Sequence, residues 1–506
     1  MRVLFVTSEV YPLAKSGGLA DVSSALAIAL TRQGIDVHLL LPGYPGAIAQ
    51  LKNPRIQAHL EPLLGVHDAA LISGQLPGSS VPVLLIYAPS LYSRSGGLYQ
   101  DKHGQDWADN ALRFAFLARV AAEIAMGRLI GWTPDVVHGN DWHAGLIPLL
   151  ISRESAPRPA TVFTVHNLAF QGNFPREILP TIGMPDEVFT ADGVEYYGQV
   201  SYLKTAIHYS DKLTTVSPTY AKEVLTPEFG CGFDGVLRAR GEHFTGILNG
   251  IDSNFWDSET DSYLPHRYSA RSISGKRKCK AELQDELGLS VSAETPLIGF
   301  VSRLAHQKMA DVILEAIPQI IGSGAQFALV SEGDSDLEAA FEELGRKCEG
   351  RVGVHIGYDE AAAHRLQAGS EILLAPARFE PCGLSQLYAL RYGTVPVVRR
   401  TGGLADTVTD ATAATLYDQS ATGFVFDDPN LSGLLGGIRR ALAVYKEPLA
   451  WRRLQLQAMA QDFSCDTSAA KYMALYRDAL GIGYSPLTGE SMLTVASGEL
   501  ERQVMR

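Results

Sequence analysis

The chain alternates short runs of apolar residues with longer segments in which apolar residues recur every three or four positions. Val3 to Val6 is a run typical of a buried strand in a parallel sheet, and residues 20–33 carry a helical apolar stripe that Gly34 can end. A second apolar run, Asp36 to Leu41, stops at a Pro-Gly pair. This pattern predicts a strand, a helix and a second strand at the start of the chain.

The same alternation continues to about residue 480 and predicts an α/β protein with two doubly wound, Rossmann-like domains. In the first half, strands are predicted at Asp135 to His138, Thr161 to Val165 and Lys212 to Ser217. In the second half, strands are predicted at Leu297 to Ser302, Phe327 to Val330, Val352 to Ile356, Ile372 to Ala375 and Val395 to Arg399.

The length of 506 residues exceeds what one hydrophobic core usually organises, ~250–300 residues. We place the boundary near Asn249, in a segment rich in turn residues, which gives an N-terminal domain at 1–248 and a C-terminal domain at 249–462. Asp257 to Lys280 is polar and expected to be a loop. A last helix, Cys465 to Ala479, lies within residues 463–482, which we expect to pack back on the N-terminal domain. Residues 483–506 are expected to form a loose tail.

Composition and charge narrow the classes of function. A formal net charge of −12 argues against a broadly electrostatic grip on nucleic acid. The five cysteines are far apart, so neither a disulfide framework nor a Cys-x-x-Cys metal site is indicated, and a reducing cytoplasm fits best. No basic, then apolar leader opens the chain and no stretch of ~18 apolar residues follows. We therefore expect a cytoplasmic protein that neither binds nor spans a membrane.

A glycine motif occurs twice, once in each half. Lys15-Ser16-Gly17-Gly18-Leu19-Ala20-Asp21 near the start is similar to Arg400-Thr401-Gly402-Gly403-Leu404-Ala405-Asp406. In each copy a predicted strand precedes the glycines and a helix-compatible segment follows. Glycines at such a turn let backbone N–H groups approach an anion, next to the positive end of a helix. A single copy would most simply be a tight turn, but the recurrence indicates two half-sites that bind a phosphate or diphosphate in one cleft.

Polar residues follow the predicted strands of the first half, where open α/β sheets bind ligands. Asp141 and His166 are candidates for binding or orienting a sugar hydroxyl. With His138 and His143 they can also be considered as a metal site. However, the spacing matches no helical His-x-x-x-His pattern, and His138 and His143 can equally be packed and hydrogen-bonded.

Two loops of the second half carry charges suited to group transfer. Arg303 and Lys308 lie on one loop and can neutralise a leaving diphosphate, while Glu380 on another can stabilise positive charge at a sugar anomeric carbon. A surface ion pair is the simpler alternative. Tyr358 can stack on a base or merely pack. Neither Gly-x-Gly-x-x-Gly nor Gly-x-x-x-x-Gly-Lys-Ser/Thr follows a leading strand, which disfavours a dinucleotide oxidoreductase and a P-loop phosphotransferase.

These motifs resemble those of a known family over roughly residues 1–480: the bacterial and plant-type glycogen (starch) synthases, retaining glucosyltransferases of GT-B architecture, in which two Rossmann-like domains face a central cleft. The matching motifs are Lys15-Ser16-Gly17-Gly18-Leu19, Asp141-Trp142-His143, His166-Asn167-Leu168-Ala169, Asn249-Gly250-Ile251-Asp252, Ser302-Arg303-Leu304 with Gln307-Lys308, Arg378-Phe379-Glu380-Pro381-Cys382-Gly383-Leu384 and Thr401-Gly402-Gly403-Leu404.

The resemblance implies transfer of glucose from ADP-glucose to the non-reducing end of an α-1,4-glucan such as glycogen, with retention and without a metal or a cofactor. It assigns Glu380 as the essential carboxylate, Arg303 and Lys308 as diphosphate-binding cations and His166 as a glucose-pocket residue. The substrate-binding positions it implies are Lys15, Gly17, Gly18, Asp21, Asp141, Asn249, Tyr358, Cys382, Gly383, Leu384, Thr401, Gly402 and Gly403.

The sequence departs from the family pattern at positions near these residues, among them Ala377, where serine is common. Met309 stands where the family usually has glycine after Lys308, and it would crowd the turn if that turn needs a positive φ. Asn140 stands where histidine is common. A catalytically weak paralogue that binds glucan or sugar nucleotide therefore remains an alternative, and a glycogen phosphorylase is a weaker one, since no lysine site for pyridoxal phosphate is evident. The residues do not decide between ADP-glucose and UDP-glucose, nor do they indicate an oligomeric state.

Overall fold

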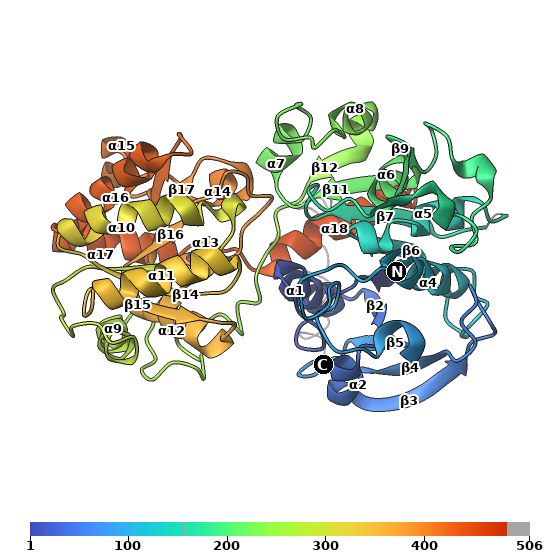
Figure 1. Ribbon diagram of the computed structural model, residues 1–506, viewed down its shortest axis with the longest axis horizontal. Coiled ribbons are helices and arrows are strands. Elements are labelled where there is room, and N and C mark those ends of the chain that lie inside the picture. Colours follow the sequence, from blue (N-terminus) through green and yellow to red (C-terminus); the bar gives the residue numbers. More distant parts are fainter. Residues whose placement is uncertain (156, 483–506) are drawn as a thin grey trace, which may run out of the picture.

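The computed structural model describes residues 1–155 and 157–482, so the predicted tail at 483–506 lies outside the described residues. The chain forms two lobes (Figure 1). The first half builds one lobe, on the right of Figure 1, and the second half builds the other. The last helix, α18 (Cys465–Ala479), returns to the first lobe, where it packs against α1 (Gly18–Arg32) and β7 (Ala160–Val165).

The first lobe is built on a nine-stranded sheet whose strands are parallel except where β4 pairs with β3 and β5. The predicted N-terminal unit is confirmed, because β1 pairs in parallel with β2, with Val3 opposite Val37, and α1 connects them. Gly34 follows α1 with φ +86°. In spatial order the strands are β12 (Phe244–Gly246), β11 (Lys212–Thr215), β7, β6 (Val136–Asn140), β1 (Arg2–Val6), β2 (Asp36–Pro42), β5 (Pro82–Tyr87), β4 (Ala70–Gln75) and β3 (Lys52–His59).

The second lobe is built on a six-stranded, fully parallel sheet. All five strands predicted in this half are present. Their apolar side chains are buried on both faces, as expected of a parallel sheet covered by helices. In spatial order the strands are β15 (Val352–Ile356), β14 (Gln326–Ser331), β13 (Leu297–Val301), β16 (Ile372–Ala375), β17 (Val395–Arg399) and β18 (Phe424–Phe426).

The remaining elements cover the two sheets. A small three-stranded sheet of the first lobe is formed by β8 (Asn173–Pro175), β10 (Gln199–Ser201) and β9 (Glu195–Tyr196). The helices of the first lobe are α1, α2 (Pro45–Gln50), α3 (Pro89–Tyr92), α4 (Asn110–Ala125), α5 (Ile147–Ser152), α6 (Tyr202–Tyr209), α7 (Pro218–Glu223) and α8 (Asp234–Ala239). Those of the second lobe are α9 (Ser274–Glu286), α10 (Ala310–Gly322), α11 (Ser335–Lys347), α12 (Glu360–Gly369), α13 (Ser385–Arg391), α14 (Gly402–Thr407), α15 (Ala413–Tyr417), α16 (Leu431–Tyr445) and α17 (Pro448–Met459).

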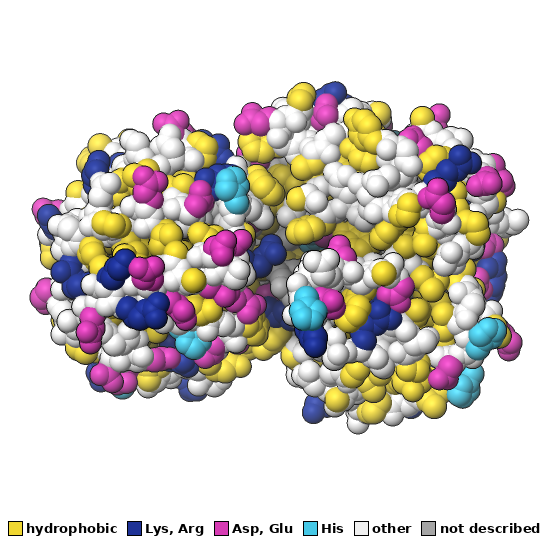
Figure 2. Space-filling model, in the orientation of Figure 1, with side chains coloured by type: hydrophobic (Ala, Val, Ile, Leu, Met, Phe, Trp, Pro, Cys, Tyr) yellow, Lys and Arg dark blue, Asp and Glu magenta, His cyan; other side chains and the backbone are white. Residues whose placement is uncertain are grey.

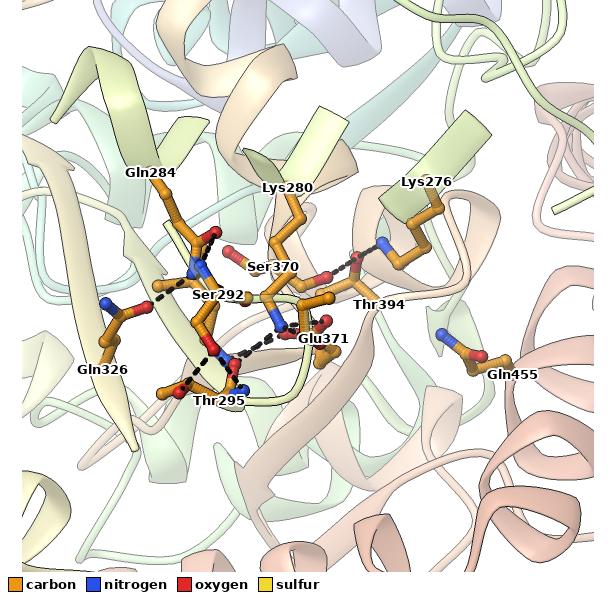
Figure 3. Close-up of polar contacts among 12 residues, drawn as sticks. Lys276, Lys280, Gln284, Ser292, Thr295, Gln326, Ser370, Glu371, Thr394 and Gln455 are labelled. Carbon is orange, nitrogen blue, oxygen red and sulfur yellow. Dashed lines mark hydrogen bonds and ion pairs between the residues drawn. The ribbon is translucent and has the colours of Figure 1, made fainter. Parts of the chain in front are cut away.

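The prediction that Asp257 to Lys280 forms a loop is wrong at its end, because α9 begins at Ser274. The face that α9 buries is mostly polar, as Figure 3 shows, so the helix carries no apolar stripe that the sequence could reveal. Lys276 Nζ donates to the carbonyl oxygen of Ala368 at 2.9 Å, and Lys280 Nζ lies 2.9 Å from a Glu371 carboxylate oxygen. Tertiary contacts, rather than apolar periodicity, hold this helix.

Each sheet has one point at which the strand order reverses, between β1 and β6 in the first lobe and between β13 and β16 in the second. Open α/β sheets bind ligands outside the carboxyl ends of their strands at such points. Figure 2 shows a furrow between the lobes, with charged side chains of both signs along it. A cavity of about 230 Å³ between the lobes is lined by side chains of both, among them Tyr11, Asp21 and Trp256. The loops of interest therefore face a cleft shared by the two sheets.

Candidate active site

Lys308 and Glu380 form a direct ion pair in the second lobe. Lys308 lies in the turn after β13, and Glu380 lies in the loop after β16; their side chains are 19% and 10% exposed. Backbone contacts hold the two loops together, because Arg378 N–H donates to the Gln307 carbonyl at 2.8 Å and Gln307 Nε2 donates to the Phe379 carbonyl at 3.1 Å. The sequence predicted that Lys308 neutralises the leaving diphosphate and that Glu380 stabilises positive charge on the sugar. The structure places these two side chains in contact.

Met309 has the left-handed backbone that the sequence analysis identified as a risk, with φ 53° and ψ 31°. This conformation costs a residue with a Cβ ~1–2 kcal/mol. The side chain is fully buried in the core beneath α10, which offsets that cost. Lys308 still reaches Glu380, so methionine at this position does not prevent the turn from forming the pair.

Arg303 follows β13 and its side chain is exposed. Among residues 1–155 and 157–482 the structure gives it no ion-pair or hydrogen-bond partner. A guanidinium that no carboxylate neutralises keeps its full charge for an anion that enters the cleft. The structure therefore leaves Arg303 available on the same loop as Lys308.

The second glycine loop packs directly on the backbone that carries Glu380. Gly402 has φ 42°, and a Cβ added there would overlap the carbonyl oxygen of Glu380; a Cβ at Gly403 would overlap the backbone of Cys382. Gly403 N–H donates to the Glu380 carbonyl at 3.2 Å. Both glycines are needed because no side chain fits between the two loops.

Each glycine loop binds a carboxylate of the chain itself. Ser16 and Gly17 donate their backbone N–H groups to Glu9 Oε2 at 2.6 and 3.0 Å. Gly402 N–H lies 3.0 and 3.1 Å from the two carboxylate oxygens of Glu223. Each loop thus directs backbone N–H groups at a carboxyl group, a contact of the kind that the sequence analysis expected with a phosphate. In this structure the anion is a glutamate side chain in each case.

Lys15 joins the first glycine loop to the second lobe. Its Nζ lies 3.0 Å from Asp21 Oδ1 in its own lobe and 3.0 Å from Glu360 Oε2 at the start of α12. Tyr358 lies two residues before Glu360, the first residue of α12, and donates its hydroxyl to the same Glu360 oxygen. The residue is 62% exposed. An exposed ring at the edge of a cleft is suited to stacking on a planar ligand.

His166 and Asp141 directly follow β7 and β6 in the first lobe. Burial lowers the pKa of His166 to about 3, so the imidazole is neutral at pH 7. Its Nε2 lies 3.1 Å from Asn140 Oδ1, an acceptor, which makes Nε2 the protonated nitrogen and Nδ1 the acceptor. Burial raises the pKa of Asp141 to about 8, so its carboxyl is mostly protonated at pH 7 and can both donate and accept. These groups suit sugar hydroxyls.

The other two histidines of the considered metal site are not arranged as ligands. Both ring nitrogens of His138 are engaged, by Tyr476 OH at 2.8 Å and by Thr164 Oγ1 at 2.7 Å. His143 is buried, and its ring stacks on Tyr99 with centroids 4.5 Å apart. Within the described ranges, no group of three or more His, Cys, Asp and Glu side chains is placed to hold a metal ion.

The remaining predicted positions lie where the lobes meet. A Cβ on Gly18 would lie 3.1 Å from Leu384 Cδ1, across the cleft. Gly383 has φ +75°, and burial raises the pKa of the Cys382 thiol to about 12, so that this cysteine is a packed, neutral group. Asn249 is buried at the passage between the lobes. His166 and Asp141, in contrast, make hydrogen bonds within the first lobe, with Asn140 and with the N–H of Trp142.

Direct hydrogen bonds also join the lobes beside Glu380. Ser217 Oγ donates to the Pro381 carbonyl at 2.7 Å, and Thr219 donates its N–H and its hydroxyl to Asp406 at 2.8 and 2.6 Å. Because Pro381 is the next residue after Glu380, the position of the proposed catalytic carboxylate depends on where the first lobe lies.

The sequence analysis missed four residues of this region: Glu9, Glu223, Glu360 and His364. Glu9 and Glu360 follow β1 and β15 closely, so the rule that polar residues after strands line the site could have found them. Glu223 ends α7 and His364 lies inside α12, and no local pattern distinguishes them. Only the contacts made by the folded chain reveal those two.

Comparison with known proteins agrees with this geometry. Residues 2–239 match the family described as the starch synthase catalytic domain, and residues 288–453 match glycosyl transferases group 1. The chain is 49% identical to a glycogen synthase of Burkholderia thailandensis, over 94% of this chain and 90% of that protein. It is 48% identical to a glycogen synthase of Paramagnetospirillum magneticum, over 96% and 98%.

Two solved structures have a similar fold. The catalytic domain of starch synthase IV from Arabidopsis thaliana, bound to ADP and acarbose, superposes with a TM-score of 0.86 at 32% identity, covering 95% of this chain and 99% of that one. A sucrose-phosphate synthase from Thermosynechococcus elongatus superposes with a TM-score of 0.57 at 17% identity, covering 95% and 100%, and shows the likeness of fold alone.

Two Rossmann-like lobes, with charged loops from both sheets at a shared cleft, define a glycosyltransferase of GT-B architecture. Within that class, the family is shown by the identity of 48–49% to two glycogen synthases over at least 94% of this chain. The chain belongs to the glycogen synthase family. No helix in the described part of the chain is both long and apolar enough to cross a membrane.

Proposed function

We propose that this glucosyltransferase moves glucose from ADP-glucose to the non-reducing end of an α-1,4-glucan, such as glycogen, with retention of configuration. The observation that carries the proposal is the pairing of Lys308 with Glu380, beside the available Arg303, at the edge of the sheet where both lobes meet. The names of the relatives and the ADP in the Arabidopsis structure support the choice of substrates.

In this proposal the diphosphate of the donor lies near Arg303 and Lys308. Two cations on one loop stabilise the negative charge that grows on the leaving ADP, so the reaction needs neither a metal nor a cofactor. Entry of the diphosphate draws Lys308 away from Glu380. The carboxylate then faces the positive charge that develops at the anomeric carbon.

The first lobe binds the transferred sugar. His166 offers Nδ1 as a hydrogen-bond acceptor and Asp141 offers a protonated carboxyl, so both can hold hydroxyl groups without a net charge. The exposed ring of Tyr358 stacks on the adenine, and Thr401 to Gly403 with Lys15 complete the donor site. The cytoplasm is the proposed location, since the five cysteines are free thiols, as a reducing compartment keeps them.

The test is transfer of radiolabelled glucose to glycogen by the purified protein, with ADP-glucose and UDP-glucose supplied separately. Incorporation from ADP-glucose is expected. Glu380→Gln, which keeps the volume and removes the charge, should lower kcat ~10²–10³-fold, as loss of one preorganised electrostatic partner does, without lowering the melting temperature. If the wild type transfers glucose from neither ADP-glucose nor UDP-glucose, the result would favour the alternative of a weak paralogue that only binds glucan or nucleotide.

A further inference from the structure

The ammonium group of Lys15 lies between two carboxylates and two aromatic rings. Asp21 and Tyr11 belong to its own lobe, whereas Glu360 and Tyr358 belong to the other. Besides the two ion pairs at 3.0 Å, its Nζ lies 5.2 Å from the centre of the Tyr11 ring and 5.7 Å from that of Tyr358. The only charged partner that the second lobe gives Lys15, among the described residues, is Glu360.

Glu360 is the more strongly ionised of the two carboxylates. Burial raises the pKa of Asp21 to about 6 in spite of Lys15. Burial would also raise the pKa of Glu360, but His364, Lys15 and the Tyr358 hydroxyl outweigh it and lower that pKa to about 2. The side chain of Glu360 is 16% exposed, so water screens the pair with Lys15 only in part. The interlobe pair is therefore a charged one throughout the physiological range.

His364 lies one helical turn after Glu360 in α12, next to the Glu360 carboxylate. Its side chain is fully buried and stacks on Trp256, with ring centroids 3.7 Å apart and an interplanar angle of 15°. Nδ1 lies 2.7 Å from Asp261 Oδ2. Nε2 has no hydrogen-bond partner in the described part of the chain and lies 3.7 Å from the second carboxylate oxygen of Glu360. Asp261 and Glu360 raise the pKa of His364 against the effect of its burial, which favours the protonated ring. In that form both ring nitrogens are donors, and Nε2–H is directed at Glu360.

Asp261, the hydrogen-bond partner of His364, is itself held by two further hydrogen bonds. Its Oδ2 also accepts from Tyr392 OH at 2.6 Å, and its Oδ1 accepts from Tyr263 N–H at 2.8 Å. The far end of α12 is fixed as well, because Lys276 Nζ donates to the carbonyl oxygen of Ala368 at 2.9 Å. Helix α12 is thus fixed at both ends. The contacts that orient Glu360, apart from its pair with Lys15, lie within the second lobe.

We propose that Glu360 and His364 are positioning residues: the series Asp261, His364 and Glu360 holds the Lys15 ammonium on the donor side of the cleft when the lobes are together. Glu360 makes the ionic contact, and His364 fixes the carboxylate that makes it. This inference rests on the proposed function in one respect, that Lys15 serves the donor. Neither residue touches the reacting atoms. Glu360 contacts two residues of the proposed donor site, Lys15 and Tyr358, and the proposal concerns its contact with Lys15.

A double-mutant cycle separates this role from general destabilisation. Glu360→Gln should lower kcat/KM for ADP-glucose about tenfold, as loss of a charge-assisted hydrogen bond does, and leave the KM for glycogen unchanged. His364→Phe, which keeps the stacked ring, should act in the same direction. In a Lys15→Ala background neither change should lower kcat/KM further. Full additivity in that background would overturn the proposal.

A matched control removes another ion pair from the same helix. Arg365 of α12 pairs with Glu286 of α9 at 2.6 Å, away from the cleft, and Glu286→Gln should leave both KM values unchanged. His364→Gln keeps a donor of similar reach and should retain more of the wild-type kcat/KM for ADP-glucose than His364→Phe. An equal effect of Glu286→Gln and Glu360→Gln on the donor would show that α12 acts only as a structural element.

A measurement without substrate distinguishes failure of this inference from failure of the proposed function. Because the Lys15–Glu360 pair joins the lobes in the ligand-free chain, Glu360→Gln should increase the radius of gyration seen by small-angle scattering, and Glu286→Gln should not. A wild type that transfers no glucose but shows this expansion would refute the function and keep the interlobe contact. An unchanged radius in Glu360→Gln would show that this pair does not hold the lobes together, whatever the activity.

Discussion

Gly402 and Met309 show how the backbone at single residues places the charged groups of the cleft. Gly402 lets the loop after β17 lie against the carbonyl of Glu380, where any Cβ would overlap. Met309 adopts the left-handed conformation that glycine favours, while its side chain fills the core under α10. One position needs glycine for space, and the other accepts methionine because burial compensates for the backbone strain.

Met309→Gly tests that balance. Glycine relieves ~1–2 kcal/mol of backbone strain, but loss of a buried methionine side chain costs ~2–5 kcal/mol. We expect a net destabilisation of about 2 kcal/mol, measured as a lower melting temperature, with kcat within about twofold of the wild type because Lys308 keeps its place. A large rise in kcat would show instead that methionine impairs the turn that carries Lys308.

At the scale of elements, α9 is the clearest case of a helix held by buried polar contacts. Lys276 donates to Ala368 and Thr394, and Gln284 Nε2 donates to Gln326 Oε1 at 2.6 Å, so the helix binds the starts of several strands at once (Figure 3). Burial lowers the pKa of Lys276 to about 7, against the attraction of Glu371. A buried lysine of this kind makes stability depend on pH.

Lys276→Met should therefore remove part of the pH dependence of stability. Between pH 7 and its usual pKa, Lys276 is neutral when folded and protonated when unfolded, so the unfolded state binds more protons and stability rises with pH. Relative to Lys276→Met, the wild type should gain about 2 kcal/mol from pH 7 to pH 9 in denaturant unfolding. Lys278→Met, at an exposed position of the same helix, should show the same pH dependence of the free energy of unfolding as the wild type. If Lys276→Met also shows the wild-type pH dependence, Lys276 is not a buried amine that changes its protonation on unfolding.

At the scale of the whole molecule, a glutamate occupies each glycine loop, and one of the two joins the lobes. Glu9 fills the first loop from within its own lobe, whereas Glu223 reaches from α7 across to Gly402 and Thr401 in the second. In the proposed function, the diphosphate of the donor approaches the same N–H groups. Glu223 and the donor then compete for one site at the junction of the lobes.

Glu223→Gln should accordingly strengthen ADP binding. Removing one unit charge ~4 Å from a phosphate is worth ~1 kcal/mol in water-like surroundings, so the Kd from calorimetry should fall about fivefold. Glu228→Gln makes the same change of net charge at an exposed position of the same lobe and should leave the Kd unchanged. An unaltered or weaker affinity in Glu223→Gln would mean that the diphosphate does not approach Gly402.

The sequence by itself determined most of the parallel strands, the two-domain division and the loops that carry the proposed chemistry, because each leaves a local pattern. The parallel strands β5, β12 and β18 were not predicted. Apolar runs mark buried strands, and glycine pairs mark backbone that must pass close to something else. Lys308 and Glu380 could be identified together because each follows a predicted strand of one sheet, and such strand ends meet at one edge. The α9 helix gave no such signal, since its buried face is polar.

Only the tertiary structure decided which partners meet the predicted residues. Lys15 and Glu360, or Glu223 and Gly402, are separated by long stretches of chain and lie in different lobes, and no spacing rule connects such positions. Their contacts depend on how two independently formed sheets come together, through hydrogen bonds such as that of Ser217 with Pro381. Periodicity reports the neighbours that a residue has within its own element, whereas an interlobe ion pair depends on the packing of the whole molecule.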